Sequence, residues 1–157
     1  MATNAAFWMG AKTLSIPMTM FRENRDKVIS ELRKVRTFEG RALIVLQGGE
    51  NLSLYDTDVD YVFRQESYFM YLFGVTEPGC YGTVDVATGS TTLFVPRLPA
   101  EYAVWMGPLL SLDDFKKKYE VDAVHYADEV SFVSLLNYHC IVPIIIHNQP
   151  TNLPTSG

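Results

Sequence analysis

The sequence lacks the features that would place it in a membrane or carry it out of the cell. It contains no apolar run of the roughly 18 residues that a membrane-spanning helix needs. Its first residues, MATNAAFWMGAKTL, have neither the charged start nor the long apolar middle of a signal peptide. These absences predict a cytoplasmic protein with no membrane partner.

Positive charge is also scarce. The chain has 13 Lys and Arg residues against 18 Asp and Glu residues, a formal net charge of −5. Because neutralising phosphates takes clustered basic side chains, this composition argues against nucleic acid as a partner. Seven of the 13 basic residues lie between residues 22 and 41, but four acids interleave with them. A solvated helix face is therefore favoured over a binding patch.

Cysteine is rare, and motifs built on cysteine are absent. Cys80 and Cys140 are the two cysteines, and they form no C-x-x-C motif. They could pair in principle. Without a secretion signal, however, buried free thiols in a reducing cytosol are the favoured reading.

Catalytic and metal-binding motifs are missing as well. The sequence has no G-x-S-x-G motif, and its three histidines never occur at the i,i+4 spacing that places two ligands on one helix face. Asp56, Asp58 and Asp60 resemble the opening of a calcium loop. Tyr61 stands where that loop needs glycine, and Ser67 stands where it needs a bidentate glutamate, so a charged surface loop is favoured. Taken alone, the residues predict no catalytic or metal site.

The composition is that of a globular domain. The 157 residues are 48% hydrophobic and 20% charged, enough to bury one core. A first helix is expected from about Pro17 to residues 39–40, with Arg25 interrupting its apolar stripe and extending to solvent. The stripe itself recurs at helical spacing: Met18, Phe21, Val28, Leu32 and Val35.

Several short strands are also predicted. Residues 42–46 form an apolar run between glycines, which is typical of a buried strand. Residues 84–86 and 93–95 flank a turn at residues 87–90 and predict a hairpin. The remaining expected strands are at 121–126 and 141–146, and residues 52–63 carry strand-like residues broken by aspartates. Helices are expected at 65–73, at 100–106, after Ser111 and at 128–136, of which 65–73 could alternatively be a strand. The count is roughly six strands and four or five helices in one α/β domain.

The polar residues at the start of the 65–73 element allow two readings. Glu66 and Glu77 could be an acid–base pair, but a helix start and a turn explain them adequately. Arg64, Gln65 and Glu66 are expected to make internal polar contacts that fix the corner between sheet and helix. The domain is predicted to occupy residues 1–150, with residues 151–157 a linker or the end of an excised fragment.

Two long strings resemble a known family. FRQESYFMYLFGVTEPGCYG and TLFVPRLPAEYAVWMG, supported by LQGGE and by Phe7, Trp8 and Gly10, are similar to the N-terminal domain of eukaryotic prolidases, the Xaa-Pro dipeptidases. More broadly, they resemble the aminopeptidase P, prolidase and creatinase group. The similarity spans roughly residues 7–130.

The resemblance implies a fold and a division of labour. The fold is an α/β domain with a mixed, roughly six-stranded sheet flanked by helices. In the family, a dinuclear metal centre, usually manganese, is held by two aspartates, a histidine and two glutamates of a C-terminal "pita-bread" domain. None of the acidic or histidine residues of this chain matches those positions. The resemblance therefore implies a non-catalytic domain that is inactive when isolated and works with its own C-terminal catalytic domain.

The resemblance also implies partners and candidate site residues. Family members form homodimers in which this domain covers the mouth of an active site and restricts entry to short Xaa-Pro peptides. Residues 95–107 match a mobile stretch that approaches the neighbouring site. Trp105 is thus a candidate to close over a proline ring, or it packs its short helix against the sheet. Arg97 could bind a peptide carboxylate or a partner acid, although a surface charge ending a strand is favoured. The alternative for the whole chain is a stand-alone binding or dimerisation module without peptidase activity.

Overall fold

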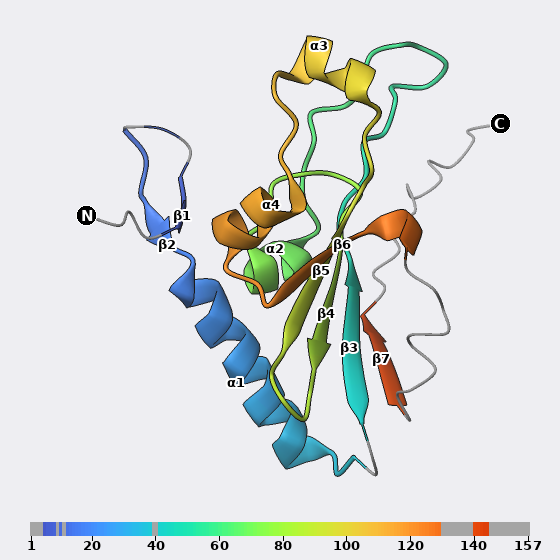
Figure 1. The fold of residues 1–157 in the computed structure, drawn as a ribbon. Helices are drawn as coiled ribbons and strands as arrows, with labels where there is room; N and C mark the ends of the chain where they lie inside the picture. The colour runs from blue at the N-terminus through green and yellow to red at the C-terminus, as the bar shows by residue number, and fades with distance from the viewer. Residues whose placement is uncertain (1–4, 9, 11, 39–40, 130–139, 145–157) are drawn as a thin grey trace, which may run out of the picture.

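A five-stranded mixed sheet forms the centre of the molecule (Figure 1). The structure is a computed structural model that describes residues 5–8, 10, 12–38, 41–129 and 140–144, with the backbone alone for residues 105, 106 and 140–144. The elements are β1 (Ala6–Phe7), β2 (Ile16–Pro17), α1 (Thr19–Val35), β3 (Ala42–Gln47), α2 (Ser67–Phe73), β4 (Tyr81–Asp85), β5 (Thr91–Val95), the 3-10 helix η1 (Ala100–Tyr102), α3 (Ala103–Met106), α4 (Leu112–Tyr119), β6 (Ala123–Tyr126), the 3-10 helix η2 (Ala127–Glu129) and β7 (Cys140–Ile144).

The sheet has the order β6-β5-β4-β3-β7. β4 pairs antiparallel with β3 and with β5, whereas β7 is parallel to β3 and β6 is parallel to β5. The predicted mixed sheet flanked by helices is confirmed. Within the described residues it has five strands rather than the roughly six predicted, because residues 52–63 form only an isolated bridge and add no strand to the sheet. β1 and β2 pair only with each other in a separate two-stranded ladder.

The core lies between one face of the sheet and the helices α1, α2 and α4 (Figure 1). In β3, Ile44 and Leu46 point into this core, and Val84 and Leu93 of the hairpin strands join them. Gly82 lets the Phe73 ring lie directly on β4, since a Cβ at Gly82 would be 2.5 Å from that ring. Close packing of this kind fixes α2 against the sheet.

The helix α1 differs from its prediction in two respects. It ends at Val35, earlier than expected, because Arg36 adopts an extended backbone that leads Phe38 back against the core. Val35 is 85% exposed and does not belong to the buried stripe, while Ile29 is buried. Residues 39–40, where the end of the helix was expected, lie outside the described residues.

The prediction that Arg25 extends to solvent is wrong. Arg25 is only 3% exposed, and its Nη1 donates to the carbonyl oxygen of Leu72. The neighbouring Asn24 donates through Nδ2 to the carbonyl of Tyr71 at 2.9 Å. The physical reason is that the last carbonyls of α2 face α1, and carbonyls at a helix end need donors from outside the helix.

The predicted hairpin is confirmed. β4 and β5 are joined by a turn in which Gly89 has φ 76°, and the Asp85 carboxylate accepts hydrogen bonds from the backbone N–H groups of Ala87 and Thr88 at 2.8 and 3.1 Å. The helix expected after Ser111 is also confirmed. It is α4, which begins with a reciprocal capping box between Ser111 and Asp114.

Two further predictions are confirmed only in part. The strand expected at 121–126 occurs as β6, which begins two residues later, and the described part of the strand expected at 141–146 is β7. Of the helix expected at 128–136, only residues 128–129 are described, within η2; residues 130–136 and 145–146 lie outside the described residues. No helix in the described ranges is long and apolar enough to cross a bilayer.

Candidate functional site

Two segments project beyond one end of the sheet, where β3 and β5 both end (Figure 1). The first is the loop of residues 48–62. It folds back on itself as a small hairpin, with hydrogen bonds from Leu54 N to Val59 O and from Tyr61 N to Leu52 O and with an isolated bridge between Ser53 and Asp60. These bonds close the loop on itself, and most of its residues are exposed.

The second projecting segment comprises residues 96–110. Prolines at 96 and 99 end β5, because proline cannot donate to a strand ladder. The chain then forms η1 and α3 and turns at Gly107, whose φ of 77° favours glycine. α3 lies at the tip of this excursion, remote from the helices that cover the sheet (Figure 1).

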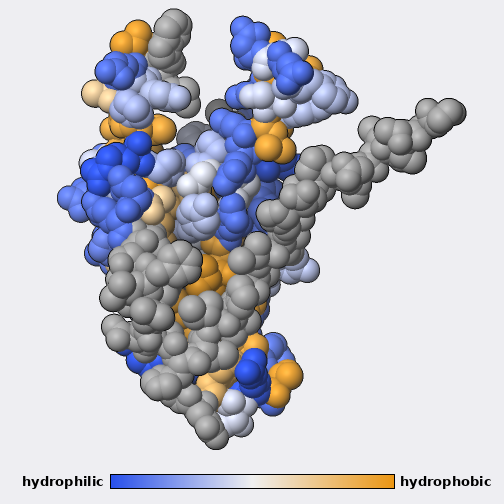
Figure 2. All heavy atoms as spheres, turned by 90° about the vertical axis from the view of Figure 1, so that its right-hand side faces the viewer, coloured by the Kyte–Doolittle hydropathy of each residue, from blue (hydrophilic) through white to orange (hydrophobic). Residues whose placement is uncertain are grey.

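Both segments expose apolar side chains to solvent. Figure 2 shows two separate lobes at this end of the molecule, each with hydrophobic residues on its surface. The exposed large hydrophobic residues of the two lobes, here called the lobe surface, are Leu52, Tyr55, Val59, Tyr61, Val62, Leu98, Tyr102, Val104, Leu109 and Leu110. Apolar side chains gathered in this way typically mark a site of interaction with another macromolecule.

Arg97 lies at the base of the second lobe and is paired within its own chain. Its Nε donates to Asp128 Oδ2 at 2.8 Å, its Nη2 donates to Glu129, and the guanidinium stacks 3.8 Å from the centroid of the Tyr126 ring. The Arg97 hydrogen bond holds the pKa of Asp128 below its usual value. These contacts agree with the favoured reading of Arg97 as a charge that ends a strand, and its role in binding a peptide stays a prediction.

Trp105 belongs to α3 in the second lobe. The structure describes its backbone alone, so its side chain lies outside the described features. Trp105 and Arg97 both belong to the segment of residues 96–110. The role of Trp105 in contacting a substrate stays a prediction.

The corner between β3 and α2 is built around the amide of Gln65. Its Oε1 accepts hydrogen bonds from the N–H groups of Gly49 and Glu66, and its Nε2 donates to the carbonyls of Val75 and Glu77. Gln65 thereby joins the base of the first lobe to the loop that follows α2, as predicted for this corner.

The two neighbours of Gln65 behave differently from each other. Glu66 caps α2 by accepting from the N–H of Phe69 at 2.7 Å, which agrees with the predicted helix start. Arg64 is exposed, so the prediction that it makes an internal contact is wrong.

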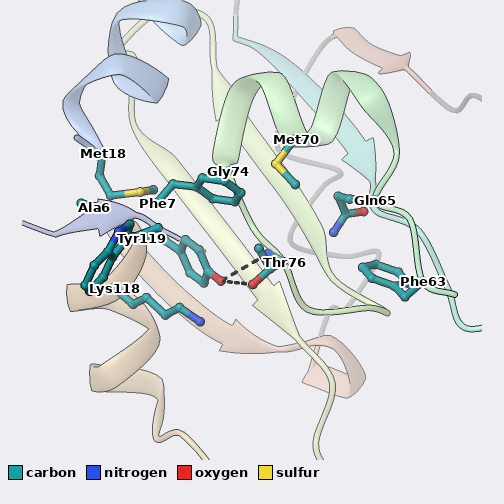
Figure 3. A pocket seen from close by; sticks show the side chains of 11 residues that line it. Ala6, Phe7, Met18, Phe63, Gln65, Met70, Gly74, Thr76, Lys118 and Tyr119 are labelled. Carbon is teal, nitrogen blue, oxygen red and sulfur yellow. Dashed lines mark hydrogen bonds between the residues drawn. The ribbon is translucent and has the colours of Figure 1, made fainter. Parts of the chain in front are cut away.

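A pocket of about 450 Å³ lies beside this corner (Figure 3). One side is formed by the β1–β2 ladder and the start of α1, and the other sides come from α2, the loop after it and the end of α4. Figure 3 shows the Tyr119 hydroxyl at the centre of the lining residues, bonded to the N–H and Oγ1 of Thr76 at 3.3 and 3.2 Å.

Behind the pocket, Glu77 binds two residues of α4. It accepts a hydrogen bond from Lys118 Nζ at 2.6 Å and another from the Tyr119 hydroxyl. Burial and the nearby Glu77 carboxylate raise the pKa of Tyr119 to about 12, so the hydroxyl keeps its proton and acts as a donor. The sequence explained Glu77 as a turn residue. It gave no signal for the pairing of Glu77 with Lys118, because 41 residues separate them.

The described residues show no arrangement suited to holding a metal ion. No three of the described His, Cys, Asp or Glu side chains come together as ligands. In the first lobe, Asp60 instead accepts a hydrogen bond from Ser53 Oγ at 3.0 Å. Cys80 is a free, buried thiol, and burial raises its pKa to about 12, which keeps the thiol protonated at neutral pH.

The family of the chain follows from its sequence. A profile of the family described as "Aminopeptidase P, N-terminal domain" matches residues 21–138, most of the chain. The chain belongs to this family. The resemblance inferred from the residue strings is thereby confirmed.

Curated relatives of this aminopeptidase P N-terminal domain are much longer proteins. The Xaa-Pro dipeptidase of Homo sapiens is 52% identical over 132 residues, covering 84% of this chain and 27% of that protein. The Xaa-Pro dipeptidase of Rattus norvegicus is 51% identical over 128 residues, covering 82% of this chain and 26% of its own length. The chain thus spans about a quarter of the length of these relatives.

Solved structures share the fold. The aminopeptidase PepP of Pseudomonas aeruginosa superposes with a TM-score of 0.68 at 18% identity, covering 86% of this chain and 30% of that one. Aminopeptidase P from Escherichia coli with the inhibitor Pro-Leu gives a TM-score of 0.67 at 20% identity, covering 82% and 29%. At these identities the likeness establishes the fold alone.

Proposed function

We propose that this domain is the non-catalytic N-terminal part of a manganese-dependent Xaa-Pro metallopeptidase, where it contributes to dimerisation and restricts the peptide-binding site. The observation that carries the proposal is the lobe surface, which concentrates exposed apolar residues at one end of a domain of this family. The names and lengths of the Xaa-Pro dipeptidase relatives support the rest.

The chemistry of such an enzyme is assigned to a following catalytic domain. The described residues do not fit a manganese site, since no three potential ligands come together. No step of peptide hydrolysis is therefore assigned to them. The proposed partners are this domain's own catalytic domain, a second copy of the whole protein and short Xaa-Pro peptides.

Two residues of the second lobe are proposed to approach the substrate. Trp105 is the first, because a rigid aromatic ring at a lobe tip can cover an apolar proline ring. Arg97 is the second. It would have to leave Asp128 and Glu129 to bind a peptide carboxylate, and both of these ion pairs are about half exposed and open readily.

A cytoplasmic location is also proposed. The free, buried thiol of Cys80 supports it, because free thiols persist in reducing compartments. The test is fractionation of cells that express the complete protein, in which recovery with secreted or organellar markers would contradict it.

Assays of the isolated domain and of the complete protein test the main proposal. With an Xaa-Pro dipeptide and manganese, the complete protein is expected to turn over and the isolated domain to show no turnover. Metal-dependent hydrolysis by the isolated domain would overturn the division of labour. A complete protein without a catalytic domain would favour a stand-alone binding module instead.

Substitutions in the complete protein test the role of the second lobe. Trp105→Ala is expected to lower kcat/KM about tenfold for Xaa-Pro dipeptides, the loss of one aromatic contact. Glu101→Ala, an exposed change in the same segment, is the matched control and is expected to leave kcat/KM unchanged. Equal effects of the two variants would show that Trp105 does not face the substrate.

A further inference from the structure

The pocket shown in Figure 3 has a volume and a lining suited to a small-molecule ligand. The proposed function assigns no role to this pocket. Its volume of about 450 Å³ lies within the roughly 300–1,000 Å³ that small-molecule pockets occupy. It lies beside the Gln65 corner, among residues of β1, α2 and α4 and of the segments next to them, none of which belongs to the lobe surface.

The walls of the pocket are mainly aromatic and thioether groups. Phe7, Trp8 and Phe63 contribute rings, and Met18 and Met70 contribute flexible, polarisable side chains. Figure 3 shows Phe7 and Met18 on one side of the lining residues and Phe63 on the other. Such walls suit a flat, apolar ring, because aromatic faces and methionine sulfur both pack well against one.

Lys118 is the one charged side chain among the residues that line the pocket. An ammonium group has three donors, and the hydrogen bond to Glu77 Oε1 uses one of them. Lys118 lines the pocket and Glu77 does not, so a ligand in the pocket would contact the Lys118 side chain rather than the Glu77 carboxylate. Partial burial lowers the pKa of Lys118, but hydrogen bonds with Glu77 and Tyr119 outweigh it and hold that pKa above its usual value, so Lys118 is charged at neutral pH.

The amide and hydroxyl groups of the lining already have partners. All four hydrogen-bonding positions of the Gln65 amide are used within the corner. The Tyr119 hydroxyl bonds to Thr76 and Glu77. Lys118 and the indole N–H of Trp8 are both donors, and the charge of Lys118 selects for an anion.

We propose that this pocket binds a free small monocarboxylate with an aromatic ring, the ring packed among Phe7, Phe63 and Met70 and the carboxylate bonded to Lys118. A single cation suits a single negative charge, and the apolar walls reject more highly charged ligands. This inference goes beyond the proposed function and does not depend on it.

Titration of the isotope-labelled chain with 3-phenylpropionate, followed by NMR, tests the proposal. Saturable shifts are expected at the amides of Gly74, Thr76 and Lys118. The neutral analogue 3-phenylpropionamide has the same ring and is expected to bind about tenfold more weakly, the effect of losing one charge-assisted hydrogen bond. Equal binding of the two compounds, or equal binding of acetate, would overturn the proposal.

Variants of two lining residues separate recognition from folding. Lys118→Met is expected to weaken the binding of 3-phenylpropionate about tenfold. Lys116→Met is the matched control, since Lys116 is exposed on the same helix and does not line the pocket. Met70→Trp fills the pocket while keeping Lys118 and is expected to abolish binding. Unchanged binding by a folded Met70→Trp variant, or tighter binding of a peptide ending in phenylalanine, would contradict a site for a free small molecule.

Discussion

The guanidinium of Arg25 donates a hydrogen bond of 2.7 Å to the carbonyl oxygen of Leu72, at the end of a helix 47 residues further along the chain. The same guanidinium lies 5.4 Å from the centroid of the Phe73 ring. The buried, charged side chain of Arg25 thus links α1 to the end of α2.

Removing this connection is expected to destabilise the domain. Arg25→Ala should lower the free energy of unfolding by about 2–3 kcal/mol, because it leaves the Leu72 carbonyl unpaired and removes buried packing. Urea denaturation measures the change. Arg22→Ala, an exposed change one turn earlier, is the control and should shift stability by less than about 0.5 kcal/mol. A fully stable Arg25→Ala variant would mean that water can replace the guanidinium.

Gly74 is expected to be intolerant of any side chain. Its φ is 65°, and an added Cβ would lie 2.5 Å from the Phe21 ring. Gly74→Ala should therefore cost about 3 kcal/mol, from backbone strain and overpacking together. Gly89 has a similar φ of 76° but its nearest neighbour would be 4.0 Å away, so Gly89→Ala should cost only about 1 kcal/mol. Thermal denaturation of both variants separates the two effects, and equal costs would contradict the proposed clash.

The Asp85 carboxylate is expected to make stability depend on acid pH. Burial alone raises its pKa, but hydrogen bonds from the Thr88 and Ala87 N–H groups and from Arg41 outweigh this and hold the pKa of Asp85 below its usual value. The unfolded chain therefore binds the proton more readily, with a pKa of about 3.9. Stability from Asp85 is complete above that pH and is lost as the pH falls through the lower folded pKa.

Comparing two variants over pH 2–6 measures this contribution. Asp85→Asn should flatten the dependence of unfolding free energy on pH below about 5. Asp113→Asn, at an exposed position in the first turn of α4, should leave the slope unchanged. The same slope in both variants would assign the acid sensitivity to other carboxylates.

The lobe surface is expected to cause weak self-association if it serves dimerisation. Sedimentation of the isolated domain at high concentration should show a concentration-dependent increase in mass. Val62→Asp and Val104→Asp, at positions 97% and 81% exposed, should remove it by placing a charge in the contact. Val35→Asp is the control, because Val35 is 85% exposed at the opposite end of the molecule (Figure 1). A strictly monomeric domain would mean that the contact needs the catalytic domain.

Features with local signals could be predicted from the sequence. The β4–β5 hairpin and the start of α4 are specified within a few residues, by a turn glycine and by a serine three positions before an acid. The family strings extended this to the mixed sheet. The number of strands in the sheet did not follow, because the strand-like residues at 52–63 bond to one another in a loop and do not join the sheet.

Features that depend on distant partners could not be predicted. Arg25 interrupts an apolar stripe, which suggested exposure, and only the position of α2 explains its burial. Lys118 and Glu77 meet across 41 residues, and the pocket beside them combines residues of β1, α2 and α4 with residues of the connecting segments. In each case the partner is fixed by tertiary packing, which the sequence pattern of a single element does not contain.

The four hydrogen bonds of Gln65 also make the corner between β3 and α2 sensitive to deamidation of this residue. Deamidation to glutamate would keep the size and shape of the side chain and exchange its two N–H donors for a second acceptor. The carbonyls of Val75 and Glu77, now bonded at 3.0 and 3.1 Å, would then face an anion. One hydrolytic event at a single amide would thus loosen the loop after α2, while the bonds that Gly49 and Glu66 donate to Oε1 are kept.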